Sequence, residues 1–179
     1  MLNPQAHRAQ RGFTLIEVIL VILVLSIGLT GVLTYVTQAA QDSAYAHNVS
    51  VATTLAQDLM EEIRSKCWDE SATATVPCAG AVAPSVIGAD GGEGRAAYDD
   101  VDDYNSLPAG GNTPPQNSQG LAMAAFPYFT QRAAVCYVAS AALDTCIAGP
   151  TNYKRASVTI AWSATDQVQL VSVFSNHPL

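Results

Sequence analysis

A long apolar segment near the N-terminus constrains this chain more than any other feature. Between Phe13 and Val36 the only acidic or basic side chain is that of Glu17. A helix needs about 20 mainly apolar residues to cross a bilayer, so this segment is long enough. Residues 1–12 are polar and carry two arginines, which favours a cytoplasmic position for that end. An uncleaved anchor is favoured over a secretory signal peptide, because no small-x-small cleavage site closely follows the apolar run.

Glu17 sets this segment apart from an ordinary membrane anchor. A carboxylate at the start of a membrane helix costs several kcal/mol unless it is paired. No cationic side chain occurs from Phe13 to Gln41. Cleavage before Phe13 would create an α-amino group four residues from Glu17, and its positive charge could pair with the carboxylate within a subunit or between subunits. The sequence therefore predicts that cleavage turns an unfavourable acid into an assembly contact.

The run RGFTLIEV, residues 11–18, resembles the prepilin processing motif of type IV pilins and type II secretion pseudopilins. The resemblance covers only the first quarter of the chain. It implies that a membrane-bound prepilin peptidase cuts between Gly12 and Phe13 and N-methylates Phe13. It also implies that Glu17 is the acid at the fifth mature position, where it contributes to filament assembly.

A second pattern continues the apolar segment as an amphipathic helix. No proline or glycine occurs between Gly31 and Pro77, and apolar residues recur at spacings of three and four. This periodicity predicts one helix over about residues 14–66, roughly 80 Å long at 1.5 Å per residue. Many major pilins have a proline midway along this helix, whereas this chain has Gly28 and Gly31, which allow a melted or bent stretch. The apolar stripe comprises Ala52, Leu55, Ala56, Leu59 and Ile63, and the opposite surface comprises Gln57, Asp58, Glu61, Glu62 and Arg64.

The remainder of the chain predicts a smaller β-rich head. Residues 68–131 are rich in glycine and proline and are predicted to be mainly loops. Strands are predicted at residues 133–140, 155–163 and 168–175, which would form an antiparallel sheet covered by the helix stripe. The predicted fold class is α+β, and a long helix followed by such a sheet is similar to the type IV pilin fold. The predicted segments are a leader (1–12), a transmembrane or filament-core helix (13–36), an amphipathic half-helix (37–67) and a periplasmic head (68–179).

Four cysteines follow the apolar segment, and their spacing does not match a zinc site. A domain carried across a membrane into an oxidising compartment favours disulfides. Sequence order favours Cys67–Cys78 and Cys136–Cys146. Four cysteines permit three connectivities, however, and the sequence does not choose among them. Four buried free thiols are the alternative.

The head also contains a crowded acidic run, with carboxylates at Asp99, Asp100, Asp102 and Asp103. Calcium takes about six to eight oxygen ligands, so these residues are candidate calcium ligands. The spacing is not that of an EF-hand loop, and a solvated acidic turn is the commoner outcome of such a run. We therefore predict a solvated turn and no cofactor, with calcium as the alternative.

Other features argue against nucleic-acid binding and against catalysis. Without the leader, the chain would have six basic and 15 acidic residues, a net charge of −9 that repels phosphate backbones. His7, His47 and His177 are scattered, and no serine or cysteine can be assigned both a base and an orienting acid. We interpret Trp68 and Trp162 as part of the head core or of the seam between helix and head, rather than as a sugar-binding platform.

Three further features resemble MSHA-type minor pilins: the helix end at residues 61–63, the segment 98–104, and a terminal strand ending near His177. This resemblance implies a minor type IV pilin, held by a single span in the bacterial inner membrane with its head in the periplasm and later assembled into a pilus at the cell surface. The implied partners are prepilin peptidase, other pilin subunits and inner-membrane lipid. A type II secretion pseudopilin and a pilus-borne adhesin or DNA-uptake subunit are alternatives. A membrane-anchored periplasmic enzyme is a fourth class, which leaves Glu17 unexplained.

Overall fold

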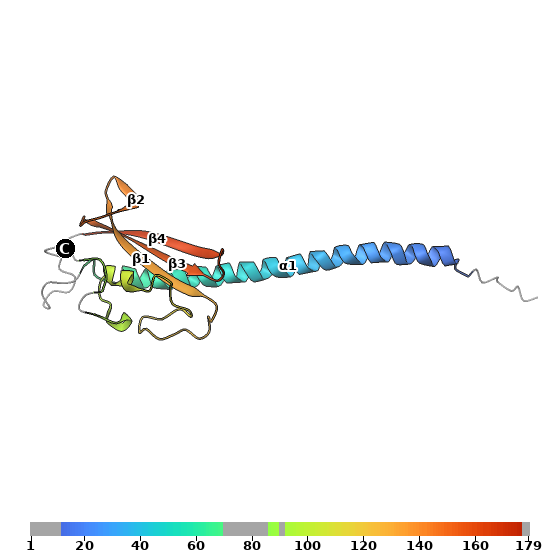
Figure 1. Ribbon diagram of the computed structural model, residues 1–179, viewed down its shortest axis with the longest axis horizontal. Helices are drawn as coiled ribbons and strands as arrows, with labels where there is room; N and C mark the ends of the chain where they lie inside the picture. The colour runs from blue at the N-terminus through green and yellow to red at the C-terminus, as the bar shows by residue number, and fades with distance from the viewer. Residues whose placement is uncertain (1–11, 70–85, 90–91, 177–179) are drawn as a thin grey trace, which may run out of the picture. The chain divides into compact units, whose positions relative to one another are not determined.

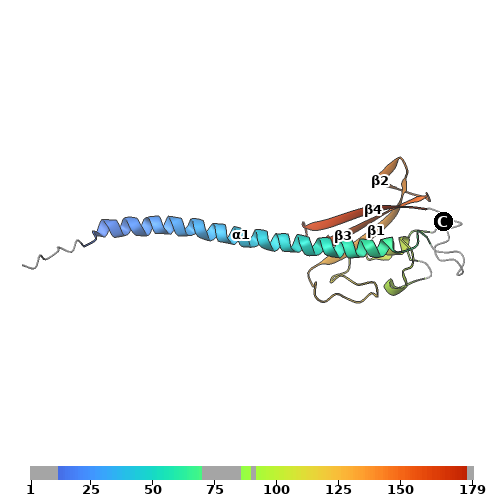
Figure 2. The same ribbon diagram turned by 180° about the vertical axis from the view of Figure 1, so that it is seen from behind.

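The computed structural model describes residues 12–69, 86–89 and 92–176 of the chain (Figures 1 and 2). The described residues form a long apolar-to-amphipathic helix and a four-stranded antiparallel sheet, which confirms the predicted α+β, type IV pilin-like architecture. The chain divides into two compact units, Met1–Ala46 and His47–Leu179. The elements are α1 (Leu15–Arg64), the short 3₁₀ helices η1 (Arg95–Ala97) and η2 (Asp102–Ser106), and the strands β1 (Thr130–Ala139), β2 (Ala142–Ile147), β3 (Tyr153–Ala161) and β4 (Gln167–Ser175).

The first unit consists, in its described part, of the N-terminal portion of α1. The helix is continuous through Gly28 and Gly31, so the bent or melted stretch that these glycines allowed is not present. Four hydroxyl side chains donate hydrogen bonds of 2.7–3.2 Å to backbone carbonyls three or four residues earlier. Such bonds satisfy the hydroxyls within the helix and without water, as an apolar environment requires. These residues are Ser26, Thr30, Thr34 and Thr37.

In the second unit, the C-terminal part of α1 packs on one face of the sheet (Figures 1 and 2). All five residues of the predicted stripe are buried, with exposed fractions of 0–4%, and Met60 extends the stripe. Full burial of a Leu or Ile side chain stabilises a fold by about 1.5–3 kcal/mol, so this stripe holds the helix to the head. The sheet residues in the same core are Val135, Ala156, Val158 and Ile160.

The sheet has the order β2-β1-β3-β4, with all neighbours antiparallel. The three predicted strands correspond to β1, β3 and β4, and β3 and β4 form the expected hairpin. The sequence did not predict β2, which pairs with the outer side of β1. Five of its six residues are exposed, so this strand lacks the alternation of apolar and polar residues that identifies a half-buried strand.

The segment between helix and sheet is mainly irregular in its described part, as predicted, and η1 and η2 are its regular elements. Four apolar residues around η2 enter the core: Tyr98, Val101, Tyr104 and Leu107 are 6%, 1%, 0% and 5% exposed. A parallel bridge between Cys67 and Asp100 aligns this segment with the chain that leaves α1. The loop region therefore covers part of the head core as a second layer beside the sheet.

Candidate functional site

The first unit presents an apolar surface without cover from the chain itself. Every large apolar side chain from Phe13 to Val36 is 46–81% exposed. None of the residues in the most apolar 18-residue window of α1 is buried, and among the described residues this is the one helix long and apolar enough to cross a membrane. The helical part, residues 15–36, is about 33 Å long at 1.5 Å per residue, against a hydrocarbon layer of about 30 Å. Apolar surface of this extent needs lipid or neighbouring chains to cover it.

The start of α1 is built around Thr14 and Glu17. The Glu17 N–H donates to the Thr14 carbonyl at 3.1 Å and contacts the Thr14 hydroxyl at 3.4 Å. Thr14 is thus the N-cap residue, and its spacing to Glu17 is that of a capping box. Glu17 lies in the first turn, where the helix dipole favours a negative charge. A capping role for Thr14 was not predicted from the sequence, although the Thr-x-x-Glu spacing is a readable signal for it.

Gly12 and Phe13 lie immediately before this cap, and both are accessible. Phe13 is 81% exposed. A Cβ atom added at Gly12 would have no neighbouring heavy atom within 4 Å. The fold itself therefore does not require glycine at residue 12. Any requirement for glycine there must come from a protein that recognises this peptide bond.

The acidic run in the head is buried, so the predicted solvated turn is wrong. Asp100, Asp102 and Asp103 are 0–2% exposed, and Asp99 alone of the four faces solvent. The Oδ1 atom of Asp100 accepts the backbone N–H groups of Asp102 and Asp103 at 2.9 and 3.2 Å. The Oδ2 atom of Asp103 accepts those of Asp99 and Asp100 at 2.8 and 3.1 Å. These bonds fix the turn that places Tyr104 in the core.

The four aspartates do not converge on one centre, as a single calcium site would require. Their oxygens fall into two groups, Asp69 with Asp100 and Asp102, and Glu93 with Asp99 and Asp103. In the first group the ammonium of Lys154 contacts both Asp102 and Asp69 and supplies the positive charge. Acidic clusters without an ion are common, and we assign no metal to either group.

Lys154 is the centre of a fully buried polar cluster. Its side chain comes from β3 and is 0% exposed. The Nζ atom donates to Asp102 Oδ1, to the backbone carbonyl of Trp68 at 2.8 Å, and lies 3.2 Å from Asp69 Oδ2. It also lies 4.3 Å from the centre of the Trp68 ring. The cluster thus joins β3 to η2 and to the chain that leaves α1.

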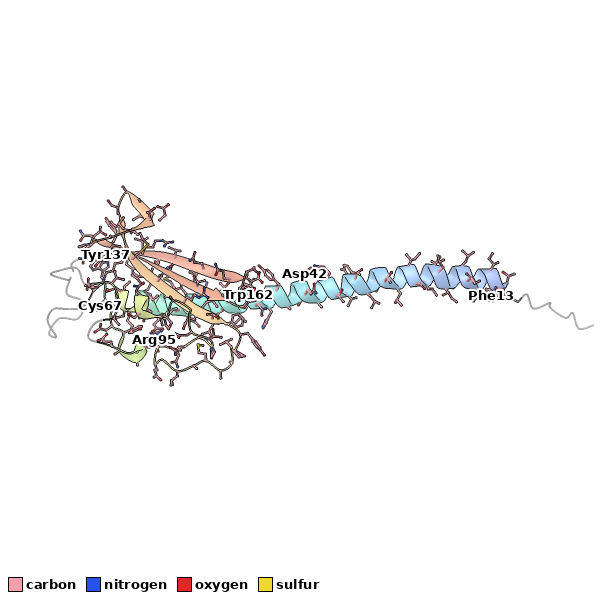
Figure 3. All side chains as sticks on the ribbon, viewed as in Figure 1. Phe13, Asp42, Cys67, Arg95, Tyr137 and Trp162 are labelled. Atoms are coloured by element: carbon pink, nitrogen blue, oxygen red, sulfur yellow. A yellow bond between two sulfur atoms is a disulfide. The ribbon has the colours of Figure 1, made fainter. Side chains whose placement is uncertain are left out.

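A second buried ion pair joins Glu62 of α1 to Arg95 of η1. The two terminal nitrogens of Arg95 donate to the two carboxylate oxygens of Glu62 at 2.6 and 2.7 Å, and the Tyr104 hydroxyl donates to Glu62 Oε1 at 2.8 Å. Figure 3 labels Arg95 on the ribbon of the head. Its guanidinium lies 4.9 Å from the Tyr104 ring centre. Burial alone would raise the pKa of Glu62, but the hydrogen bonds from Arg95 and Tyr104 hold it below its usual value. The prediction that Glu62 belongs to the solvent-facing helix surface is therefore wrong.

The cysteines and tryptophans occupy structural positions in the head. A disulfide joins Cys136 of β1 to Cys146 of β2. Cys67 is also disulfide-bonded, whereas Cys78 lies outside the described residues. Trp162 packs beside Phe129 at the sheet end of the core. Trp68 donates its ring N–H to the Phe174 carbonyl at 3.4 Å, which agrees with a role in the core and its seams. His7 and His177 also lie outside the described residues.

Comparison with known families accounts for the N-terminal geometry. Residues 7–33 match the family model described as the prokaryotic N-terminal methylation motif. The chain carries a prepilin-type methylation motif. This motif supports a member of the type IV pilin and pseudopilin family, with processing by prepilin peptidase and assembly with other pilins. The exposed apolar helix and the motif together fit membrane anchoring followed by filament assembly. Searches of curated proteins and of solved structures gave no match.

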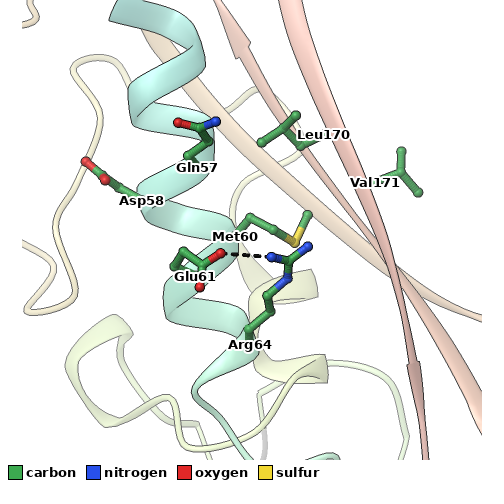
Figure 4. A pocket seen from close by; sticks show the side chains of 7 residues that line it. All are labelled: Gln57, Asp58, Met60, Glu61, Arg64, Leu170 and Val171. Carbon is green, nitrogen blue, oxygen red and sulfur yellow. Dashed lines mark hydrogen bonds and ion pairs between the residues drawn. The ribbon is translucent and has the colours of Figure 1, made fainter.

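The methylation motif points to a structural subunit. The head also has a surface pocket. It lies between the C-terminal part of α1 and β4 (Figure 4). Its charged residues include Glu61 and Arg64, which form an ion pair of 2.8 Å with each other. Both side chains are more than half exposed. The lining residues are Gln57, Asp58, Met60, Glu61, Arg64, Leu170 and Val171.

Proposed function

We propose that this chain is a minor type IV pilin, a structural subunit that is processed by prepilin peptidase and then assembles into, or primes, a pilus. The observation that carries the proposal is the combination of the methylation motif with an apolar helical segment whose large side chains are 46–81% exposed and whose one charged side chain before Gln41 is that of Glu17. The patchy resemblance to MSHA-type minor pilins supports the finer assignment.

In this proposal, peptidase cleaves between Gly12 and Phe13 and methylates the new amino group of Phe13. The helix over residues 13–36 first lies in the inner membrane and later in the filament core, because both environments cover its apolar side chains. The head, residues 68–179, faces the periplasm before assembly and the outside afterwards. Glu17 pairs with the amino terminus of its own subunit or of a neighbour, since no side chain in the segment can neutralise it.

Mass spectrometry of the protein from cells tests the processing step. The mature chain should begin at Phe13 and carry one N-methyl group. Replacement of Gly12 by valine should leave uncut precursor in the membrane. A Cβ atom at this position has no neighbouring heavy atom within 4 Å, so a steric clash in the fold does not explain this result. Gly28→Val is the matched control, because Gly28 also has no neighbouring atom in reach and lies outside the motif's cleavage site. A mature terminus at Met1, or one beyond Val36, would contradict the proposal.

The methylation motif equally supports a type II secretion pseudopilin, and a pilus-borne adhesin or DNA-uptake subunit uses the same anchor. Deletion of each assembly system in the host separates these functions. A minor pilin should lose its surface location when the pilus assembly system is removed and keep it when the secretion system is removed. The opposite pattern would assign the chain to secretion. Before any deletion is made, genes for a retraction motor next to the gene for this chain would favour the pilus.

A further inference from the structure

The buried cluster around Lys154 contains more carboxyl groups than a single ion pair needs. Three carboxyl groups, from Asp69, Asp100 and Asp102, have oxygens within 4.8 Å of one another. All three residues are 0–4% exposed. The Lys154 ammonium is the one cationic side chain that an ion pair places among them in the described residues. The cluster thus contains more acid than its positive charge neutralises.

Asp100 is the member of this cluster that is best suited to hold a proton, because it lies close to the other two carboxyl groups. Burial, together with the charges of Asp102 and Asp103, raises the pKa of Asp100 to about 8. Its interaction with the Asp102 side chain acts in the same direction, so a proton is held on Asp100 more readily than on an exposed carboxyl group. Asp102 thus lies within reach of both the Lys154 ammonium and the Asp100 carboxyl group.

Aromatic side chains and the backbone shield these groups from water. The Lys154 Nζ atom lies 4.3 Å from the Trp68 ring centre and 5.8 Å from that of Tyr137. In the sheet, Lys154 is paired with Tyr137 of β1 and with Phe174 of β4, so it sits in an interior strand. Water competes with the amine for the carboxyl group, and it also reverses amide formation by hydrolysis. Burial excludes that water.

We propose that Lys154 and Asp102 form an intramolecular amide bond, with Asp100 as proton donor and Asp69 as proton acceptor. The reaction joins the Lys154 Nζ atom to the Asp102 side-chain carbonyl carbon. The fold holds the two groups in contact. Bringing two reacting groups together accounts for a large part of the barrier to a bimolecular reaction, and the fold removes that part. This inference does not depend on the pilin function.

The bond balances without an oxidant, a reductant or any co-reactant. Lys154 gives a proton to Asp69 and attacks as the neutral amine. Asp100 gives its proton to a departing oxygen of Asp102, and the Nζ–carbon bond forms as the carbon–oxygen bond breaks. The second proton of the amine completes the leaving water, and the proton held by Asp69 returns to Asp100. An ammonium and a carboxylate thus become one neutral amide and one water molecule.

Peptide mapping of the full chain, purified from membranes in detergent, reduced and denatured, tests the proposal directly. The wild-type chain should be lighter than its composition by one water, after allowance for leader removal and methylation. Digestion should yield one branched fragment in which the peptide containing Lys154 is linked to the peptide containing Asp102. Trypsin should also fail to cut after Lys154. A full mass with two separate peptides would overturn the proposal, as would a link from Lys154 to Asp69.

Three variants separate the reaction from folding. Lys154→Arg keeps the positive charge but lacks the reactive amine, so the branched fragment should disappear while the head still melts cooperatively. Asp100→Asn keeps the carbonyl oxygen that accepts the N–H groups of Asp102 and Asp103, and it should lower the linked fraction at least tenfold. Asp144→Asn removes an exposed acid on β2 and should leave the linked fraction unchanged. Undiminished linkage in Asp100→Asn would overturn the role of Asp100.

Discussion

At the scale of single residues, the stability of the head depends on charges that are buried with their partners. The Glu62–Arg95 pair is the clearest case, because its side chains are 18% and 7% exposed and the contact is bidentate. Taking one partner away leaves the other charge buried without compensation, which typically costs about 3–5 kcal/mol. An exposed pair such as Glu61–Arg64 contributes far less, about 0–1 kcal/mol.

We therefore predict that Arg95→Ala lowers the free energy of unfolding of the head by about 3 kcal/mol, whereas Arg64→Ala lowers it by less than about 1 kcal/mol. Denaturant unfolding of the full chain in detergent, followed through the head tyrosines, measures both. The pKa of Glu62 is lower in the folded state, so the stabilisation is present above pH 4.5 and is lost as the pH falls below that value. The difference in unfolding free energy between wild type and Arg95→Ala should therefore shrink as the pH falls below 4.5. Equal effects of the two substitutions would contradict this assignment.

The positions predicted from the sequence were wrong mainly for single charged residues that are buried. Glu62, Asp100 and Asp102 all belong to locally polar patterns, and such patterns normally lie at the surface. Their partners lie far along the chain, since Arg95 is 33 residues from Glu62 and Lys154 is 52 from Asp102. Local spacing holds no information about such contacts. The N-terminal methylation motif was readable because its most specific residues, 11–18, are contiguous in the sequence.

At the scale of elements, β2 is held to the sheet by few contacts. Five of its six residues are exposed, and its pairing with β1 shifts in register between Val138 and Ala139. The Cys136–Cys146 disulfide adds a covalent link between the same two strands, ten residues apart in sequence. In the loop-entropy model, a disulfide that closes a loop of this length stabilises the fold by about 2–3 kcal/mol.

We predict that replacing Cys136 and Cys146 together by serine costs about 2–3 kcal/mol and raises amide exchange selectively in β2. Hydrogen exchange with peptide resolution measures this, and β4, also an edge strand, is the internal control. Exchange that rises equally in both edge strands would show that the disulfide supports the whole sheet instead. Non-reducing digestion of the same samples tests the pairing proposed for Cys67, which should link to Cys78.

The contrast between local sequence patterns and long-range contacts also explains which helices and strands could be predicted from the sequence. The helix was predictable to within two residues at each end because its apolar stripe recurs with helical period over many turns. The β3 and β4 strands were predictable because their apolar residues alternate. Strand β2 has neither pattern and depends on pairing and on a disulfide, and both are tertiary features.

At the scale of the whole molecule, the two units have opposite requirements. The head buries a core of its own, while the residues from Phe13 to Val36 leave their large apolar side chains exposed. Only lipid or other subunits can cover that surface. Under the proposed function, the single carboxylate of Glu17 would favour the filament over the membrane, because lipid offers it no partner and processed neighbours would offer amino termini.

We predict that Glu17→Val yields a subunit that is cut and inserted but not assembled. Valine makes the helix more apolar, so membrane insertion should be kept, and cleavage depends on the bond between Gly12 and Phe13. Loss of one partner of a buried pair costs about 3–5 kcal/mol, enough to lower incorporation by more than a hundredfold. The measurement is the amount of the Phe13-started protein in membranes against its amount in sheared filaments. Asp42→Val is the control, because Asp42 is the next acid along α1 and lies beyond the apolar segment. Normal incorporation of Glu17→Val would show that the acid is not an assembly contact, and would place the subunit at a filament tip, where no further subunit needs its partner.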